Sequence, residues 1–455
     1  MITTGPMQAI PRIERRAAWR VCLCGLLLLL LTLPGRAQAP SPAVRCVTLP
    51  DGVRLLLKPE PDTEVTAIVA FVRTEPEPDP DPAAAELVAR ALFFGSLNRS
   101  MDRISRSITQ VGGLLETLRT PDYVAVTCVT VGEQLNEAAY LICEALKNAD
   151  FAPEALDRAR QSLLDERRER ADDGFETARA DLCARLSGAS EPGQLALRRV
   201  TQERAQDYFQ RHYVPARTVI AVVGRFQPDA AQRAFDADLY DYDHPAPRAR
   251  AITTAPQKPN FNAETQTFLT SGGVAYALVG VPAPDVTSPD YPAFTVLQTL
   301  LGGGHAARLF RRVRDTLGLG YEVGATYRAD RADPLIAYLQ WDTRRALPGP
   351  AMAALKPEEA LKLLQVQLDA LLADPPTEAE LTRARNYAIG RDALRHERAR
   401  DRAFLLGWYE TMGLGYAFDA EFPRRLAAVT RADVLRVAHT YLAARATALA
   451  LPKSN

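Results

Sequence analysis

Hydrophobic and polar positions follow two different spacings along this 455-residue chain, and each spacing predicts a different kind of element. In residues 123–131, "YVAVTCVTV", the side chains alternate as in a sheet strand. In residues 133–148, "EQLNEAAYLICEALKN", apolar residues return at helical spacing. The runs "RCVTL" and "VRLLLKPE" flank the turn "PDG" at residues 50–52, which predicts a hairpin. Thr201 precedes a further amphipathic segment, where its hydroxyl can cap a helix.

These elements occur twice in the same order. Residues 155–170, "ALDRARQSLLDERRER", resemble residues 380–395, "ELTRARNYAIGRDALR", with Arg160 opposite Arg385. Internal similarity of this kind is typical of two related halves. Each half has a strand pair, a helix, alternating strands, long helices and a final strand. The sequence therefore predicts an α+β fold of two homologous halves, each an antiparallel sheet flanked by helices. Two further pairs of segments keep the order: residues 199–224 with 428–452, and residues 65–72 with 274–281.

The repeat also sets the expected domain boundaries. We expect the first half over residues 44–226 and the second over residues 263–455. Residues 227–262, between them, are rich in Pro, Asp and Ala, with "HPAPRAR" near the middle. This composition predicts an exposed linker between the halves.

The N-terminal residues 1–39 have the features of a secretory signal peptide. Several arginines precede the apolar run "VCLCGLLLLLLTLP", and small residues follow at Ala37 and Ala39. The apolar run is short for a membrane span, which needs about 20 residues. Cleavage after Ala39, cleavage after Ala43 and retention as a membrane anchor all stay open. We expect an exported, periplasmic protein, either free or anchored by this segment.

Charge and cysteine content exclude several classes of protein. Acidic and basic residues balance at 55 each, so no net field favours nucleic acid or an acidic membrane. Beyond the signal segment no two cysteines form a C-x-x-C pair, which excludes a zinc ribbon. We expect buried free thiols, with one disulfide as the alternative in an oxidising compartment. These cysteines are Cys46, Cys128, Cys143 and Cys183.

Residues 302–321, "GGGHAARLFRRVRDTLGLGY", combine three glycines, an arginine-rich amphipathic run and a glycine-flanked tyrosine. The stretch contains neither G-x-x-x-x-G-K-[ST] nor a G-x-G-x-x-G that follows a strand, so it is not a phosphate-binding loop. The simplest role of the glycines is to turn the chain tightly between two helices.

The longer segment "LLGGGHAARLFRRVRDTLGLGYEVGA", residues 300–325, resembles the second-half signature of the insulinase/pitrilysin zinc peptidases. The resemblance extends over residues 44–452, and the family shares the internal repeat. It implies two halves that close around a chamber. It also implies that Arg314 and Tyr321 point into this chamber and bind the substrate backbone, where fixed donors stabilise a developing negative charge. The alternative is that Arg314 pairs with a local carboxylate such as Asp315 and Tyr321 packs in the core.

The same resemblance implies an inverted zinc motif, H-x-x-E-H, in the first half. The chain has Glu86, Ala89 and Arg90 at these positions, and Glu166, or less favourably Glu169, at the position of the remaining ligand. Arginine is always protonated and cannot bind zinc, and alanine cannot transfer a proton. We therefore expect no metal or other cofactor in this chain. We also expect Arg90 to contact Glu86 or Glu166, so that a guanidinium replaces the charge of the metal.

No other residues supply a catalytic set. None of the five histidines has metal-ligand spacing, and only His305, inside the glycine stretch, stands where the family usually has a small residue. No G-x-S-x-G motif is present. In "GGLLETLRT", residues 112–120, Glu116 and Thr117 stand where the family has Asn-Ala at the edge of the cleft. Backbone pairing of a peptide to such an edge does not depend on these side chains.

The resemblance implies a zinc-less, substrate-binding subunit of an exported heterodimeric metallopeptidase. Its partner would be a zinc-bearing chain of the same family, which alone would hold the metal, and its substrate would be an unfolded peptide. The alternative is a structural or peptide-binding protein of this fold with no role in proteolysis. A third reading is an active peptidase that binds metal in an unrelated way.

Overall fold

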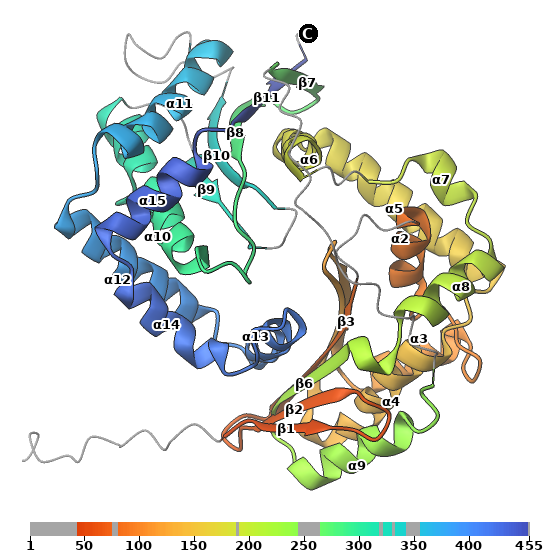
Figure 1. Cartoon of the computed structure of the whole chain (residues 1–455). Coiled ribbons are helices and arrows are strands. Elements are labelled where there is room, and N and C mark those ends of the chain that lie inside the picture. The colour runs from red at the N-terminus through yellow and green to blue at the C-terminus, as the bar shows by residue number, and fades with distance from the viewer. Residues whose placement is uncertain are drawn as a thin grey trace, which may run out of the picture. The chain divides into compact units, whose positions relative to one another are not determined.

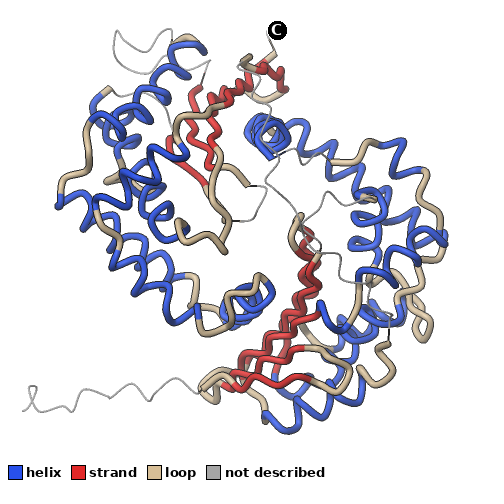
Figure 2. Tube along the Cα trace, viewed as in Figure 1, coloured by secondary structure: helices blue, strands red, loops and turns tan. Residues whose placement is uncertain are grey.

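The computed structural model describes residues 43–74, 81–187, 191–243, 264–317, 322–329, 333–342 and 355–453. Residues from Val44 onward form one compact unit. It contains two β-sheets with helices packed beside them (Figures 1 and 2), so the expected α+β class is confirmed.

The first sheet has six strands in the order β1-β2-β6-β3-β5-β4. The predicted hairpin joins β1 and β2, and β5 covers the predicted alternating strand. The expectation of a purely antiparallel sheet is wrong, because β6 is parallel to β2 and antiparallel to β3. A strand inserted between two antiparallel strands must run parallel to one of them. The strands are β1 (Arg45–Thr48), β2 (Arg54–Pro59), β3 (Val65–Arg73), β4 (Leu114–Arg119), β5 (Tyr123–Val131) and β6 (Thr218–Gly224).

The second sheet repeats this arrangement with five strands, in the order β7-β11-β8-β10-β9. The final strand β11 is again inserted, parallel to β7 and antiparallel to β8, so this sheet is mixed for the same reason. The strands are β7 (Gln266–Thr270), β8 (Val274–Val281), β9 (Glu322–Thr326), β10 (Leu335–Asp342) and β11 (Ala446–Pro452).

Corresponding helices of the two halves begin with the same capping chemistry. The Thr201 hydroxyl accepts a hydrogen bond from the backbone N–H of Arg204, and the Thr430 hydroxyl accepts one from that of Asp433. The predicted cap at Thr201 is therefore confirmed, and its repeat partner has the same role. The first-half helices are α2 (Pro82–Ala91), α3 (Met101–Gln110), α4 (Leu135–Asn148), α5 (Pro153–Asp172), α6 (Gly174–Ser187), α7 (Gln194–Arg198), α8 (Gln202–His212) and α9 (Pro228–Asp238), with short 3₁₀ turns η1 (Gly132–Gln134) and η2 (Pro215–Arg217). The second-half helices are α10 (Tyr291–Gly302), the π-helix η3 (Phe310–Thr316), α11 (Pro357–Ala373), α12 (Glu378–Leu394), α13 (Ala399–Thr411), α14 (Phe418–Ala428) and α15 (Arg431–Tyr441).

Each sheet is covered on one face by a helix that belongs to the other half. Helix α13 packs on β3 and β6, and α6 packs on β8 and β11 (Figure 1). At the first contact Phe404 lies 5.2 Å from Phe71, measured between ring centroids. At the second contact, Leu186 of α6 packs so closely on Gly280 of β8 that a Cβ on Gly280 would lie 2.7 Å from the Leu186 side chain. The two halves are therefore joined by exchanged helices as well as by the chain between them.

The first part of the expected linker is folded onto the first half. Residues Pro228–Asp238 form α9, which packs on α4 and β2. Phe235 and Tyr242 are fully buried in the first-half core. The expectation of an exposed linker is thus wrong for residues 228–242, because their apolar side chains recur at helical spacing among the Asp and Ala residues. Residues 244–263 lie outside the described residues.

Candidate functional site

Helix α2 carries Glu86, Ala89 and Arg90, the residues at which the sequence resemblance places the zinc motif. Asp81 caps the helix by accepting a hydrogen bond from the Ala84 N–H, and Pro82 occupies the first turn, where its missing N–H costs nothing. Most of α2 is buried against the core, whereas Glu86 and Arg90 are only partly buried. This face of α2 packs against α5.

Arg90 forms an ion pair with Glu166 on α5. This is one of the two contacts expected from the sequence, and it places a guanidinium beside the carboxylate that the resemblance aligns with the last zinc ligand. The Arg90 and Glu166 side chains are 35% and 47% exposed, so the pair is solvated. Pairs of this kind contribute about 0–1 kcal/mol.

Glu86 pairs with Arg167 instead of Arg90, at an Nη2–Oε2 distance of 2.5 Å. Arg167 also approaches the Glu191 carboxylate, with Nε 3.2 Å from Oε2, and donates to the Pro192 carbonyl at 2.7 Å. Burial raises the pKa of the Glu86 carboxyl, and the positive charge of Arg167 opposes this shift. Arg167 was missed by the sequence reasoning because intrahelical spacing favoured Arg90 as the partner of Glu86. The cluster "DERRER" around it was the available signal.

The described residues here do not fit a zinc ion. Ala89 is 3% exposed and supplies no proton-transfer group. The two carboxylates, Glu86 and Glu166, each have a guanidinium partner. Zinc in a catalytic site needs three protein ligands, and a fixed cation at the second ligand position repels it. Across the described ranges, no group of three or more His, Cys, Asp or Glu side chains is arranged to hold a metal ion.

The glycine stretch allows the end of α10 to approach β9 closely. A Cβ on Gly302 would lie 2.3 Å from the backbone nitrogen of Ala325, so only glycine fits there. Gly304 has a φ of +126°, which favours glycine, and lies against Tyr387. These glycines therefore have a packing and turning role, and no phosphate-binding geometry is needed to explain them.

Arg314 lies in the π-helix η3 and is exposed. Its guanidinium lies over the Phe310 ring, with Cζ 5.1 Å from the ring centroid, and the His305 ring lies 4.5 Å from Phe310. Tyr321, the other expected substrate-binding residue, lies outside the described residues. The Arg314/Tyr321 pair thus stays a prediction, with Arg314 placed on an accessible segment.

Strand β4, which contains most of the "GGLLETLRT" segment, is an edge of the first sheet. Leu114 and Leu118 are 42% and 47% exposed. The Glu116 carboxylate pairs with Arg400 on α13, at 3.1 Å. An edge strand presents unpaired backbone groups, to which an extended peptide can add as a further strand.

The remaining titratable candidates have structural surroundings. His396 contacts the Asp419 carboxylate at 2.9 Å and the Asp392 carbonyl at 2.8 Å, and the Asp419 contact raises the His396 pKa. The four cysteines beyond the signal segment are free thiols, as expected, but the expectation that they are buried holds for Cys128 and Cys143 and is wrong for Cys46 and Cys183, which are partly exposed. Burial raises the pKa of Cys128 and of Cys183 to about 11, so neither is an activated nucleophile. In the part of the chain that the structure describes, we find no helix with both the length and the apolarity of a membrane span.

Comparison with known proteins gives a consistent class. Residues 199–387 match the family model described as the peptidase M16 inactive domain. An uncharacterized zinc protease of Streptomyces coelicolor is 26% identical over 425 residues, 88% of each chain. A probable mitochondrial-processing peptidase subunit beta of Arabidopsis thaliana is 22% identical, over 58% of this chain and 51% of that one.

Solved structures share the fold. A peptidase M16 inactive domain from Pseudomonas fluorescens superposes with a TM-score of 0.77 at 19% identity, and covers 90% of this chain and 98% of its own. A protease from Helicobacter pylori gives 0.76 at 16% identity, with 90% and 100% covered. The family match and the named relatives together define a peptidase-related protein. Residues 199–387 carry the inactive domain of the M16 peptidase, or insulinase, family, and most of the chain is similar to a relative named as a zinc protease.

Proposed function

We propose that this chain is the zinc-less, substrate-binding subunit of an exported heterodimeric M16 peptidase that degrades or processes unfolded peptides. In this proposal its two halves enclose a chamber, and a second chain of the family supplies the zinc and the general base. The observation that carries the proposal is the Arg90–Glu166 ion pair at the position of the missing zinc.

The electrostatics at this position support a role without hydrolysis. Peptide hydrolysis by a zinc peptidase needs a metal to activate water and a base to take its proton. Arg90 supplies a permanent positive charge but no lone pair for the metal, and Ala89 supplies no base. Both carboxylates have arginine partners, so the cluster is electrically balanced without an ion.

Two exposed features support retained peptide binding. Strand β4 offers an open edge with exposed leucines, which suits backbone pairing with an extended peptide. Arg314 lies on an accessible helix, where a guanidinium can donate to a peptide carbonyl oxygen.

Partnership and export rest on other observations. The Arabidopsis relative is named as a subunit of a processing peptidase, which supports the proposal of a partner chain. The arginines and the apolar run in the first 39 residues support the proposal of export.

The proposal is tested by mixing this chain with a zinc-bearing M16 chain from the same organism. We expect a quenched fluorescent peptide to be cleaved rapidly only by the mixture. Arg314→Ala or Tyr321→Phe in this chain should lower kcat/KM of the mixture by about 100-fold, the effect of removing one donor to a developing oxyanion. Arg312→Ala is the matched control, because Arg312 is an exposed arginine of the same π-helix.

Other outcomes separate the alternatives. Co-purification with undiminished activity in the Arg314 and Tyr321 variants would favour a structural protein. Stoichiometric zinc in the isolated chain, together with turnover by that chain alone, would show an active peptidase that binds its metal elsewhere.

A further inference from the structure

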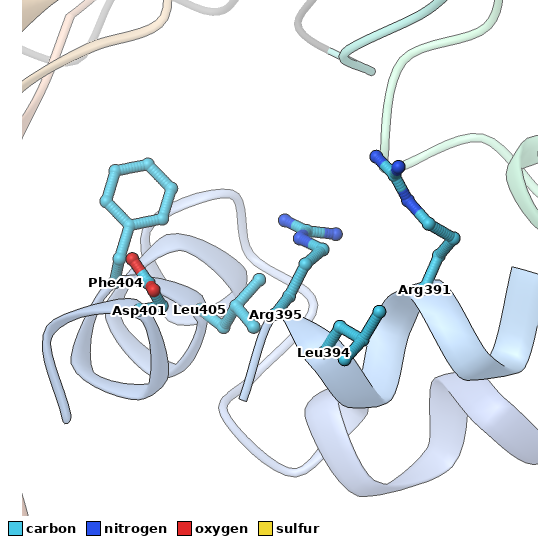
Figure 3. Close-up of a pocket in the computed structure, with 6 residues that line it drawn as sticks. All are labelled: Arg391, Leu394, Arg395, Asp401, Phe404 and Leu405. Atoms are coloured by element: carbon cyan, nitrogen blue, oxygen red, sulfur yellow. The ribbon is translucent and has the colours of Figure 1, made fainter. Parts of the chain in front are cut away.

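A pocket of about 420 Å³ lies where α12 ends and α13 begins (Figure 3). This volume is within the range of ligand sites, about 300–1,000 Å³. Nothing in the sequence reasoning indicated it, because its walls come from two helices and the turn between them. The pocket is lined by Arg391, Leu394, Arg395, Asp401, Phe404 and Leu405.

The pocket carries excess positive charge. Arg391 and Arg395 are four residues apart. Figure 3 shows that both guanidinium groups project to the same side of the helices as the Phe404 ring. Among the described residues Arg391 has no ion-pair partner. Asp401 also lines the pocket, but its carboxylate pairs with Arg400, at 3.6 Å, and Arg400 does not line the pocket. Arg395 also interacts with the buried Asp392 carboxylate. Arg391 is therefore the cation most available to a ligand.

Apolar side chains lie beside these charges. Leu394, Leu405 and the Phe404 ring line the pocket beside the two arginines. Phe404 is fixed, because its ring packs 5.2 Å from Phe71 and 6.2 Å from Tyr123 on the first sheet. The pocket is open to solvent, because Leu394 is 59% exposed, so binding depends on the guanidinium fork, which matches a planar carboxylate.

The pocket is also linked to the edge strand β4. The Arg400–Glu116 pair, at 3.1 Å, joins the first turn of α13 to β4. Phe404 follows one helical turn after Arg400 on the same helix.

We propose that this pocket is a subsite for a carboxylate of a bound peptide, either its C-terminal carboxylate or an acidic side chain. This inference rests on the proposed peptide-binding function and names a chemical preference of its substrate.

The test measures binding of four matched peptides to the full-length chain by fluorescence anisotropy. The probe is an unfolded, fluorescein-labelled peptide of about ten Ala, Ser and Leu residues, long enough to add as an edge strand. It is made with a free or an amidated C-terminus, and with one internal Glu or Gln. We expect at least one of the two carboxylates to tighten binding about tenfold relative to the amidated Gln peptide, which corresponds to ~1.4 kcal/mol.

Arg391→Gln should abolish that tenfold difference and leave binding of the amidated Gln peptide unchanged. Arg383→Gln is the matched control, because Arg383 is an exposed arginine on α12 that does not line the pocket. Both residues are exposed, so thermal unfolding should show both variants folded. Dependence on the C-terminal group identifies the terminus as the ligand, and dependence on Glu identifies the side chain.

Two results would contradict the inference, and they differ in whether the proposed peptide-binding function is also wrong. If all four peptides bind equally well to the unmodified chain, or if Arg391→Gln keeps the tenfold preference, the carboxylate subsite is wrong while peptide binding stands. If no peptide binds, the proposed peptide-binding function is wrong and the subsite is wrong with it.

Discussion

The packing of α13 on the first sheet gives a sharp test at Gly407. A Cβ on Gly407 would lie 2.5 Å from Cε2 of Phe71 and 3.3 Å from the Cβ of Ala221. Carbon atoms pack best at about 3.5–4.0 Å, so Gly407→Ala requires a displacement of roughly 1 Å. The helix, the ring or the sheet must move.

Phe71 has little room to move. Its side chain is fully buried, and its ring contacts Tyr123 at 5.4 Å and Phe404 at 5.2 Å between centroids. Overpacking of such a site costs about 1–3 kcal/mol. Alanine also gains about 1 kcal/mol over glycine within a helix, which partly hides this cost.

Gly390→Ala on α12 removes this ambiguity. Gly390 is exposed and no atom lies within 4 Å of a Cβ built on it, so only the helical gain of about 1 kcal/mol applies. The difference in unfolding free energy between the two alanine variants cancels that gain. It isolates the packing cost, and we expect Gly390→Ala to be more stable by about 1–3 kcal/mol.

The assay is urea unfolding followed by circular dichroism and tryptophan fluorescence, with midpoints and slopes compared for both variants. Coincident transitions by the two probes would justify a single free energy. If Gly407→Ala is as stable as Gly390→Ala, α13 does not pack on β3 as closely as the structure shows.

Two further substitutions test the charged clusters. Arg90→Ala should lower the free energy of unfolding in urea by about 0–1 kcal/mol, because its ion pair is solvated. Arg167→Ala should lower it by about 2–3 kcal/mol, because it leaves the largely buried Glu86 carboxylate unpaired. Equal losses in the two variants would contradict this ranking. The contact with Asp419 raises the pKa of His396, so the protonated imidazole stabilises the fold. This stabilisation should be complete below about pH 6.5, the ordinary pKa of histidine, and should disappear as the pH rises through the raised pKa. The urea midpoint should follow this trend, and His396→Gln should remove it; an unchanged trend in the variant would show that another group titrates.

Local features of the fold were predictable from the sequence because neighbouring residues determine them. The cap at Thr201 needs only its own hydroxyl and an N–H three residues on. The hairpin at residues 50–52 needs only a turn between two apolar runs. The parallel pairing of β2 with β6 joins Arg54 to Val219, and no local pattern indicates so distant a partner.

The ion pairs of Glu86 and Glu166 show the same limit. Sequence spacing predicted that arginine would neutralise the carboxylates, and Arg90 does contact Glu166. It did not predict the second pair, because the i,i+4 rule considers one helix at a time. Glu86 instead reaches across to Arg167 on α5, where the packing of two helices decides the partner. Charge balance was predictable, whereas the exchange of partners between helices was not.

The exchanged helix α13 connects the features on which both proposals depend. Its first turn contacts the edge strand through Arg400 and Glu116, its Phe404 ring forms a wall of the carboxylate pocket, and its Gly407 sets its distance from the first sheet. A shift of this helix therefore moves the pocket relative to β4. Gly407→Ala should weaken the carboxylate-dependent part of peptide binding as well as the fold, whereas Gly390→Ala should leave binding intact. If Gly407→Ala lowers stability but not the carboxylate preference, the pocket and β4 do not act on the same peptide.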